Sequence, residues 1–163
     1  LAANALSKAA KDGSDEAFIR SVVGFPKYID KNTLERNERF EIAERLARLG
    51  LFQRAASFLP RLPESITERR TTSKVLSNLG QTASAIEVIE DQSQELLPEL
   101  GDLYARTGYI QEALASLSDG DQNEVATFLA IQAGEWDWVA ENGTHDASFA
   151  TQALRNSIEL DTA

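Results

Sequence analysis

Apolar residues in this chain recur three and four positions apart, most clearly across residues 96–117, LLPELGDLYARTGYIQEALASL. This spacing places apolar side chains on one face of a helix. The first such face carries Leu97, Leu100, Leu103 and Tyr104. The second carries Ile110, Ala113, Leu114 and Leu117. Gly108 lies between them, at a helix end where a left-handed residue without a Cβ is favoured. The stretch is therefore predicted to be a hairpin of two helices.

Similar periodicity, together with residues typical of helix ends, predicts helices along the whole chain. They are expected at residues 1–11, 15–23, 33–49, 51–59, 66–79, 82–90, 97–107, 109–117, 122–133, 135–141 and 146–160. Ser65 and Glu68 have the spacing of a capping box, and Asp121 and Glu124 repeat that spacing before a later helix. A short apolar segment is expected to close one end of the core with Phe25, Tyr28 and Ile29.

A repeat becomes visible when four glycines, Gly50, Gly80, Gly108 and Gly134, are aligned at spacings of 30, 28 and 26 residues. Small residues stand seven positions before them: Ala43, Ser73, Gly101 and Thr127. Small residues also stand five positions after them: Ala55, Ala85, Ala113 and Val139. Mostly large residues stand two positions after them: Phe52, Thr82, Ile110 and Trp136. Small side chains are needed where helices cross closely and bulky ones where hairpins stack, which predicts a helical solenoid.

The third copy resembles the tetratricopeptide repeat at its defining positions, which here are Leu97, Leu100, Gly101, Tyr104, Gly108, Ile110, Ala113 and Leu117. The resemblance covers about residues 36–142. The copies are shorter than the usual unit of about 34 residues and lack its closing proline. The resemblance implies an all-α, right-handed α-solenoid of TPR-like antiparallel hairpins. We expect an irregular helical N-terminal region at 1–32, four hairpins at 33–143 and a C-terminal capping helix at 144–163.

The resemblance also implies a protein–protein interaction module, because the first helix of each such hairpin lines a concave face that receives a peptide or a partner helix. That face would carry Arg48 beside Glu44, and then Arg70, Lys74, Asn78, Asp102, Arg106, Glu124, Phe128 and Gln132. Arg70 and Lys74 lie one turn apart and have the chemistry to bind a carboxylate. The alternative is that they are ordinary solvated residues.

Two tryptophans, Trp136 and Trp138, stand two positions apart and cannot share one helix face. Trp136 lies in the apolar column of the repeat and is assigned to the core. Trp138 is the candidate aromatic anchor for a partner, since tryptophan is enriched at binding hot spots. The alternative for Trp138 is packing on the C-terminal helix near Phe149.

The net charge of −10 is unevenly distributed along the chain. Residues 1–74 carry 14 Lys/Arg and 10 Asp/Glu, whereas residues 75–163 carry 2 Lys/Arg and 16 Asp/Glu. Phosphate repulsion argues against nucleic acid as a partner of the acidic half, and a basic protein segment fits it better. A surface that merely maintains solubility is the alternative. No apolar run is long enough to insert into a membrane.

The composition leaves compartment and oligomeric state open. The chain has no cysteine, so it forms no disulfide, which suits the cytoplasm and the periplasm equally. It begins at Leu1 and contains no methionine, so we expect it to be part of a longer protein.

The residues that carry catalysis or bind metals and cofactors form no recognisable set. His145 is the only histidine and is expected in a loop, without a second nitrogen or sulfur ligand or a nucleophile beside it. No glycine-rich phosphate loop is present. The sequence therefore predicts no catalytic, cofactor-binding or metal-binding residue, and a non-catalytic scaffold or adaptor. A periplasmic assembly factor or chaperone built on the same repeats is one alternative. A hydrolase using two of Glu99, Asp102 and Glu112 is another, and it requires two carboxylates that converge in one pocket.

Overall fold

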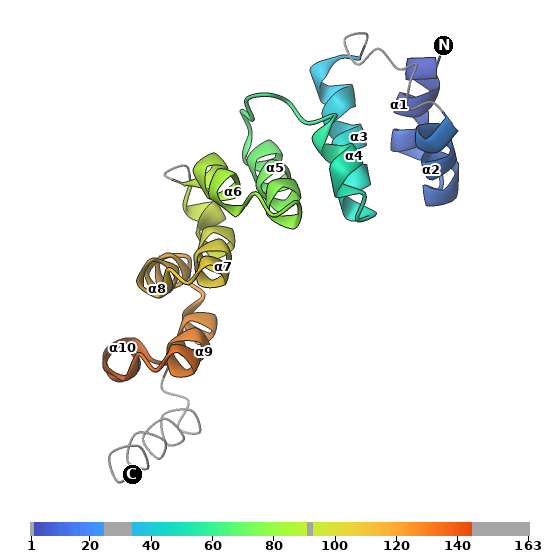
Figure 1. Ribbon diagram of the computed structural model, residues 1–163. Coiled ribbons are helices and arrows are strands. Elements are labelled where there is room, and N and C mark those ends of the chain that lie inside the picture. The colour runs from blue at the N-terminus through green and yellow to red at the C-terminus, as the bar shows by residue number, and fades with distance from the viewer. Residues whose placement is uncertain (1, 25–33, 91–92, 145–163) are drawn as a thin grey trace. The chain divides into compact units, whose positions relative to one another are not determined.

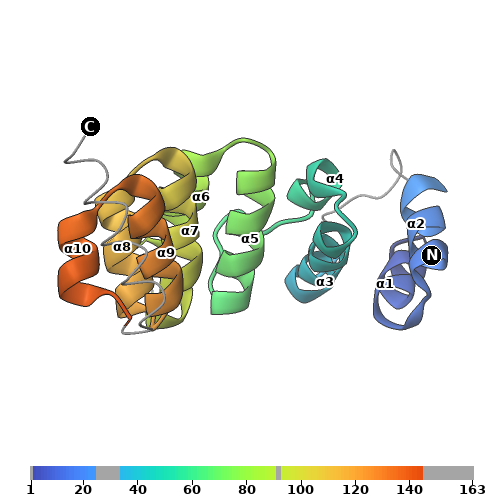
Figure 2. The same ribbon diagram turned by 90° about the horizontal axis from the view of Figure 1, so that it is seen from below.

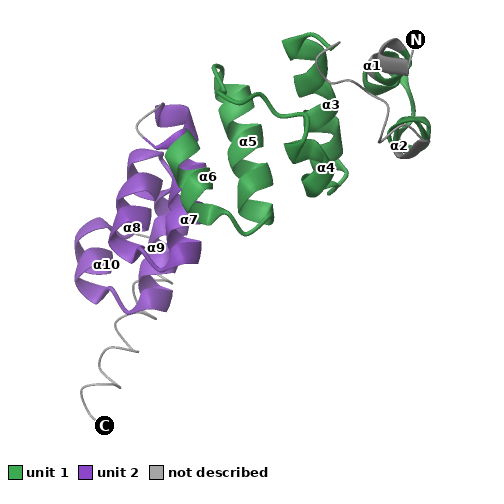
Figure 3. Ribbon diagram, turned by 45° about the horizontal axis from the view of Figure 1, so that its top comes forward, with its two compact units in different colours: residues 1–88 green, residues 89–163 purple. Residues whose placement is uncertain are grey.

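The computed structural model describes residues 2–24, 34–90 and 93–144, and within these residues it is entirely helical, with no strand (Figure 1). The chain divides into two compact units, Leu1–Val88 and Ile89–Ala163 (Figure 3). The helices of the first part are α1 (Ala2–Asp12), α2 (Asp15–Gly24), α3 (Arg36–Arg48), α4 (Phe52–Ala56), α5 (Ile66–Asn78) and α6 (Thr82–Ile89). The second part has the 3₁₀ turn η2 (Gln94–Leu96) and helices α7 (Leu97–Thr107), α8 (Ile110–Asp119), α9 (Asn123–Ala133) and α10 (Trp136–Asn142).

Unit 1 is built on a core that extends from α1 to α5. Helix α1 packs against α2 and α3, and α4 packs against α3 and α5 (Figures 1 and 2). Leu6 of α1, Phe18 of α2 and Ile42 of α3 are fully buried in one cluster with Ala55 of α4 and Val75 of α5. The two helices predicted in the N-terminal region are thus present, and they share one core with the first hairpin.

Unit 2 is organised around α8, which packs against both α7 and α9, while α10 packs against α9 (Figures 1 and 2). The cluster behind this stacking joins α8 to α9 and includes the buried side chains of Leu114, Leu117, Ala126 and Ala130. Trp138 and Val139 of α10 pack against the same cluster. Burial of these side chains is what holds the second hairpin of the unit on the first.

The assignment of the two tryptophans has to be corrected. Both Trp136 and Trp138 are half-buried, and it is Trp138 that packs against the cluster formed by α8 and α9. The candidate anchor therefore faces its own unit. Trp136 starts α10, and its indole Nε1 lies 3.9 Å from the position that a Cβ on Gly134 would occupy. Phe149, the alternative neighbour of Trp138, lies outside the described residues.

The four aligned glycines all have positive φ, at 74°, 79°, 83° and 76°, which confirms the predicted helix junctions. Each junction has the same hydrogen bonds, those of a Schellman motif. At Gly108, for example, the glycine N–H donates to the Ala105 carbonyl at 3.2 Å and the Tyr109 N–H donates to the Tyr104 carbonyl at 3.0 Å. The equivalent donors at the other three junctions are Leu51, Gln81 and Glu135.

The two predicted columns of small residues are buried where helices meet. Ala43, Ser73, Gly101 and Thr127 are buried, as are Ala55, Ala85 and Ala113; Val139 is half-buried. Gly101 gives the reason in one hairpin, since a Cβ added there would lie 2.6 Å from Leu117 Cγ and 3.2 Å from the Ala113 carbonyl oxygen. Helices α7 and α8 thus approach too closely for a larger residue at this position.

The α8–α9 connection differs from the prediction. Asp121 was expected to cap α9 with Glu124, but it has φ 57°, and Gln122 precedes the helix without a side-chain capping bond. Asp121 occupies the left-handed position of another Schellman motif, because its N–H donates to the Ser118 carbonyl and the Gln122 N–H donates to the Leu117 carbonyl at 2.7 Å. It cannot act as an N-cap in the same place.

Other helix limits agree with the prediction or differ by a few residues. The Ser65–Glu68 capping box is present, with the Glu68 N–H donating to Ser65 Oγ at 3.1 Å. Helix α4 ends at Ala56 rather than at residue 59, because the chain tightens into i→i+3 turns before Pro60, a residue that disfavours helix before it. The expected apolar plug with Phe25, the capping helix 146–160 and His145 lie outside the described residues.

Candidate functional site

A groove lies between α7 and α9 in unit 2, and we call it the α7–α9 groove. Its volume is about 270 Å³. Helix α7 and the end of α8 contribute Pro98, Asp102, Ala105 and Leu117. Helix α9 and the residue before it contribute Gln122, Val125, Phe128, Leu129 and Gln132.

The helix repeat explains why these residues meet. Pro98, Asp102 and Ala105 follow one another at steps of four and three, so they form one stripe along α7. The α9 residues from Val125 to Gln132 form a corresponding stripe. Because α8 packs against both helices, its buried side chain of Leu117 lines the groove from behind.

The groove exposes two large apolar side chains to solvent. Val125 is 49% exposed and Phe128 is 52% exposed, and they stand one turn apart on α9. Two further large apolar residues of the described part are this exposed, Leu62 and Tyr109. Tyr109 has a ring neighbour, since it meets Tyr104 edge to face with ring centroids 6.2 Å apart. Removing apolar surface from water is favourable, so a neighbouring pair of exposed apolar residues in a groove favours association.

The edge of the groove is polar and acidic. Asp102 Oδ2 lies 2.8 Å from Arg106 Nη2, an ion pair one turn long on α7 with both side chains more than half exposed. Glu124, which is also exposed, stands one turn before Phe128 on α9. Gln122 and Gln132 bound the α9 side. The groove thus has an apolar centre and a carboxylate-bearing rim.

Part of the predicted concave face meets at this groove. Asp102, Phe128 and Gln132 line it, and Arg106 and Glu124 stand beside lining residues on the same two helices. Sequence reasoning missed Val125, although its position three residues before Phe128 was a signal for it.

The predicted residues of unit 1 are exposed to solvent. Arg48, Arg70, Lys74 and Asn78 all face solvent. The Asn78 side-chain amide donates to the Lys74 carbonyl at 2.8 Å, so it caps its own helix. Arg48 lines a separate, polar pocket of about 380 Å³ whose other residues include Asp12, Asp15 and Arg45.

Arg45 in this pocket holds the N-terminal helices together. Its guanidinium is buried and donates from Nη1 to the carbonyls of Ala9 and Ala10, each at 2.7 Å. Its Nη2 donates to the Gly13 carbonyl and, at 3.0 Å, to Asp15 Oδ1. It also lies 4.8 Å from the ring centroid of Phe18. A side chain of α3 thus donates to carbonyls at and just after the end of α1, of which the Ala9 carbonyl also accepts the Gly13 N–H at 3.1 Å, and its role is structural.

Two of the carboxylates that could serve a hydrolase line separate pockets of unit 2. A cleft of about 550 Å³ in unit 2 is lined by Glu90, Tyr104 and Glu112 among others, and Tyr104 Oη donates to Glu90 Oε1 at 2.6 Å. Glu112 lines this cleft, whereas Asp102 lines the α7–α9 groove. Of the three carboxylates considered for a hydrolase, Asp102 and Glu112 therefore line different pockets, and Glu99 lines neither of the two.

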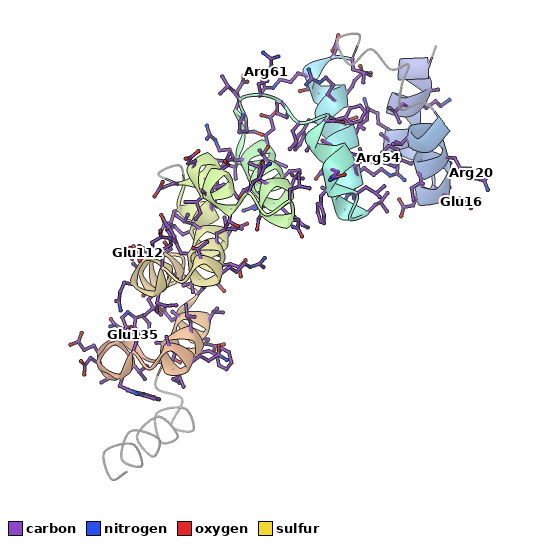
Figure 4. The ribbon with its side chains drawn as sticks, viewed as in Figure 1. Glu16, Arg20, Arg54, Arg61, Glu112 and Glu135 are labelled. Carbon is purple, nitrogen blue, oxygen red and sulfur yellow. The ribbon has the colours of Figure 1, made fainter. Side chains whose placement is uncertain are left out.

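Charged residues of unit 1 also form ion pairs on the surface of a single helix. Glu16 and Arg20, one turn apart on α2, form a solvent-exposed ion pair at 2.6 Å (Figure 4).

Within the described residues, no three His, Cys, Asp or Glu side chains are grouped so as to hold a metal ion. Among the same residues, no helix has the length and apolar character needed to cross a membrane.

Comparison with protein-family models, with curated proteins and with solved structures gives no match for this chain.

Proposed function

We propose that the chain is a non-catalytic protein-docking module, a TPR-like stack of helical hairpins that serves as a scaffold or adaptor. Two features support the repeat: the four glycine junctions share one hydrogen-bond pattern, and the small residues beside them are buried at helix contacts. The observation that carries the function is the α7–α9 groove, where Val125 and Phe128 are about half exposed. A partner segment that covered them would remove this apolar surface from water.

The test compares partners captured from a native lysate by the whole chain and by two variants. Phe128→Ser removes the apolar side chain of the groove. Leu62→Ser is the matched control, since Leu62 is 77% exposed and lies in unit 1. We expect a partner that is retained by the wild type and by L62S and is lost from F128S. Retention by all three baits, with circular dichroism showing that F128S is folded, would move the docking surface away from this groove.

A third variant tests the predicted carboxylate-binding face of unit 1. Arg70→Ala, Lys74→Ala and Asn78→Ala are combined in one chain. Because these residues lie outside the groove, we expect this triple variant to retain the partner. If the triple variant loses the partner and F128S retains it, the docking surface lies in unit 1 instead.

A further inference from the structure

We propose that the occupant of the α7–α9 groove is a basic amphipathic helical segment of another protein, a proposal that rests on the function proposed above. Its apolar face would contact Val125 and Phe128, and its lysines or arginines would pair with the carboxylates of the rim.

The dimensions of the groove favour a peptide segment. The stripe from Pro98 to Ala105 and that from Val125 to Gln132 each extend about 10 Å, which is two helical turns. An amphipathic helix presents apolar residues at i, i+3, i+4 and i+7 over the same length, the usual pattern of helix-in-groove binding.

The charge of unit 2 favours a basic occupant. Its described residues, 89–90 and 93–144, include eleven Asp/Glu and a single Lys/Arg, Arg106. Arg106 is already paired with Asp102 at 2.8 Å. An acidic segment would therefore meet carboxylates with no cation left to receive it in this part of the chain, whereas a basic segment would be attracted before contact.

Three carboxylates line the groove or stand next to its lining residues in the sequence. Asp102 lines the groove from α7, Glu124 stands immediately before Val125 on α9, and Asp121 immediately precedes Gln122. All three side chains are exposed. Since an exposed ion pair such as that between Asp102 and Arg106 is weak, a partner guanidinium can replace Arg106 at little cost.

The experiment uses the whole chain and three synthetic 14-residue peptides with leucines at i, i+3, i+4, i+7 and i+11. The remaining positions are lysine in the first peptide, glutamate in the second and glutamine in the third. Binding is measured by fluorescence anisotropy at low and high salt, and the surface is mapped by amide chemical shifts. We expect the lysine peptide to bind at the α7–α9 groove, to bind more weakly to F128S and at high salt, and to bind more tightly than the other two.

Matched charge variants separate the groove from the acidic surface in general. Asp102→Asn with Glu124→Gln removes two carboxylates at the groove. Asp137→Asn with Glu141→Gln removes two exposed carboxylates on α10 and changes the net charge equally. We expect the first pair to weaken binding of the lysine peptide roughly tenfold and the second to change it little. Equal weakening by both pairs would overturn the proposal, because attraction would then be unspecific.

The outcomes also distinguish this proposal from the proposed function. If the glutamine or glutamate peptide binds as well as the lysine peptide and its binding depends on Phe128, the groove docks helices but the inference about charge is wrong. If no peptide binds in a manner that depends on Phe128, both the inference and its basis in the α7–α9 groove are overturned.

Discussion

Arg36 and Glu68 form a two-pronged ion pair that joins α3 to the first turn of α5 across 32 residues of sequence. Arg36 Nε donates to Glu68 Oε1 at 3.1 Å and Nη2 donates to Oε2 at 2.8 Å. Glu68 is only 7% exposed and also accepts the Glu64 backbone N–H at 2.7 Å. The hydrogen bond from Arg36 is the main reason that the pKa of Glu68 falls from 4.5 to about 2. The same hydrogen bond raises the pKa of Arg36.

This pair predicts a pH-dependent contribution to stability. Because the pKa of Glu68 is lower in the folded chain, its stabilisation is complete above pH 4.5 and is lost as the pH falls toward 2. The shift corresponds to about 3 kcal/mol. We expect Glu68→Gln to lower the free energy of unfolding by about this amount at pH 7 and by much less near pH 2, as measured in urea. Glu64→Gln, at a carboxylate 74% exposed, is the control and should have a small effect. A constant difference across this pH range would contradict the assignment.

Arg45 is expected to be the most sensitive cation of unit 1. Arg45→Ala leaves the Ala10 and Gly13 carbonyls without this donor and removes one of the two donors to the Ala9 carbonyl, and we expect a loss of about 3 kcal/mol in the free energy of unfolding. Arg45→Lys should restore only part of it, since an ammonium lacks the planar fork. Arg48→Ala, on the exposed face of the same helix, should stay within about 0.5 kcal/mol of wild type. Urea titrations of the three variants give the comparison, and equal losses at Arg45 and Arg48 would refute it.

The left-handed residues predict substitutions of opposite sign. Gly50 has φ 74° and nothing within 4 Å of an added Cβ, so the cost of Gly50→Val is conformational and should be about 1 kcal/mol or more. Asp121 has φ 57°, and Asp121→Gly should stabilise by up to about 1 kcal/mol. Thermal unfolding measures both. Destabilisation by Asp121→Gly would contradict this prediction and show that the Asp121 carboxylate stabilises the fold by more than its backbone strain costs.

Gly101 is a position where space, not backbone conformation, should decide the outcome. We expect Gly101→Ala to cost about 1–3 kcal/mol because its Cβ meets Leu117 Cγ at 2.6 Å. A double-mutant cycle with Leu117→Ala should show that the second change offsets much of the cost of the first. Additive losses in urea would show that the two side chains do not compete for this space.

The hairpins could be predicted because their junctions depend on local chemistry. A backbone position with positive φ favours glycine, so Gly50 and its three counterparts indicated the junctions. The capping box at Ser65 also depends only on residues close in sequence. Asp121 was misassigned because its spacing to Glu124 is that of a capping box, whereas its own backbone has φ 57°. Arg45 was missed because its partners lie 30 or more residues away and no periodicity relates them.

The candidate groove was predictable only in part, for a related reason. The repeat indicated which helices would line a concave face, and this gave Asp102, Phe128 and Gln132. The repeat did not indicate what fraction of each neighbouring side chain would be exposed to solvent. The exposure of Val125 and the packing of Trp138 depend on the rotation of α9 and α10 against α8, which tertiary contacts set.

Leu117 gives the groove an unusual kind of control. The same side chain fills the space that Gly101 leaves open, belongs to the cluster that seats α9, and lines the α7–α9 groove. The α7–α8 contact, the packing of α9 and the lining of the groove therefore all depend on this one side chain. We expect a substitution at Gly101, which does not line the groove, to change the shape of the groove through Leu117.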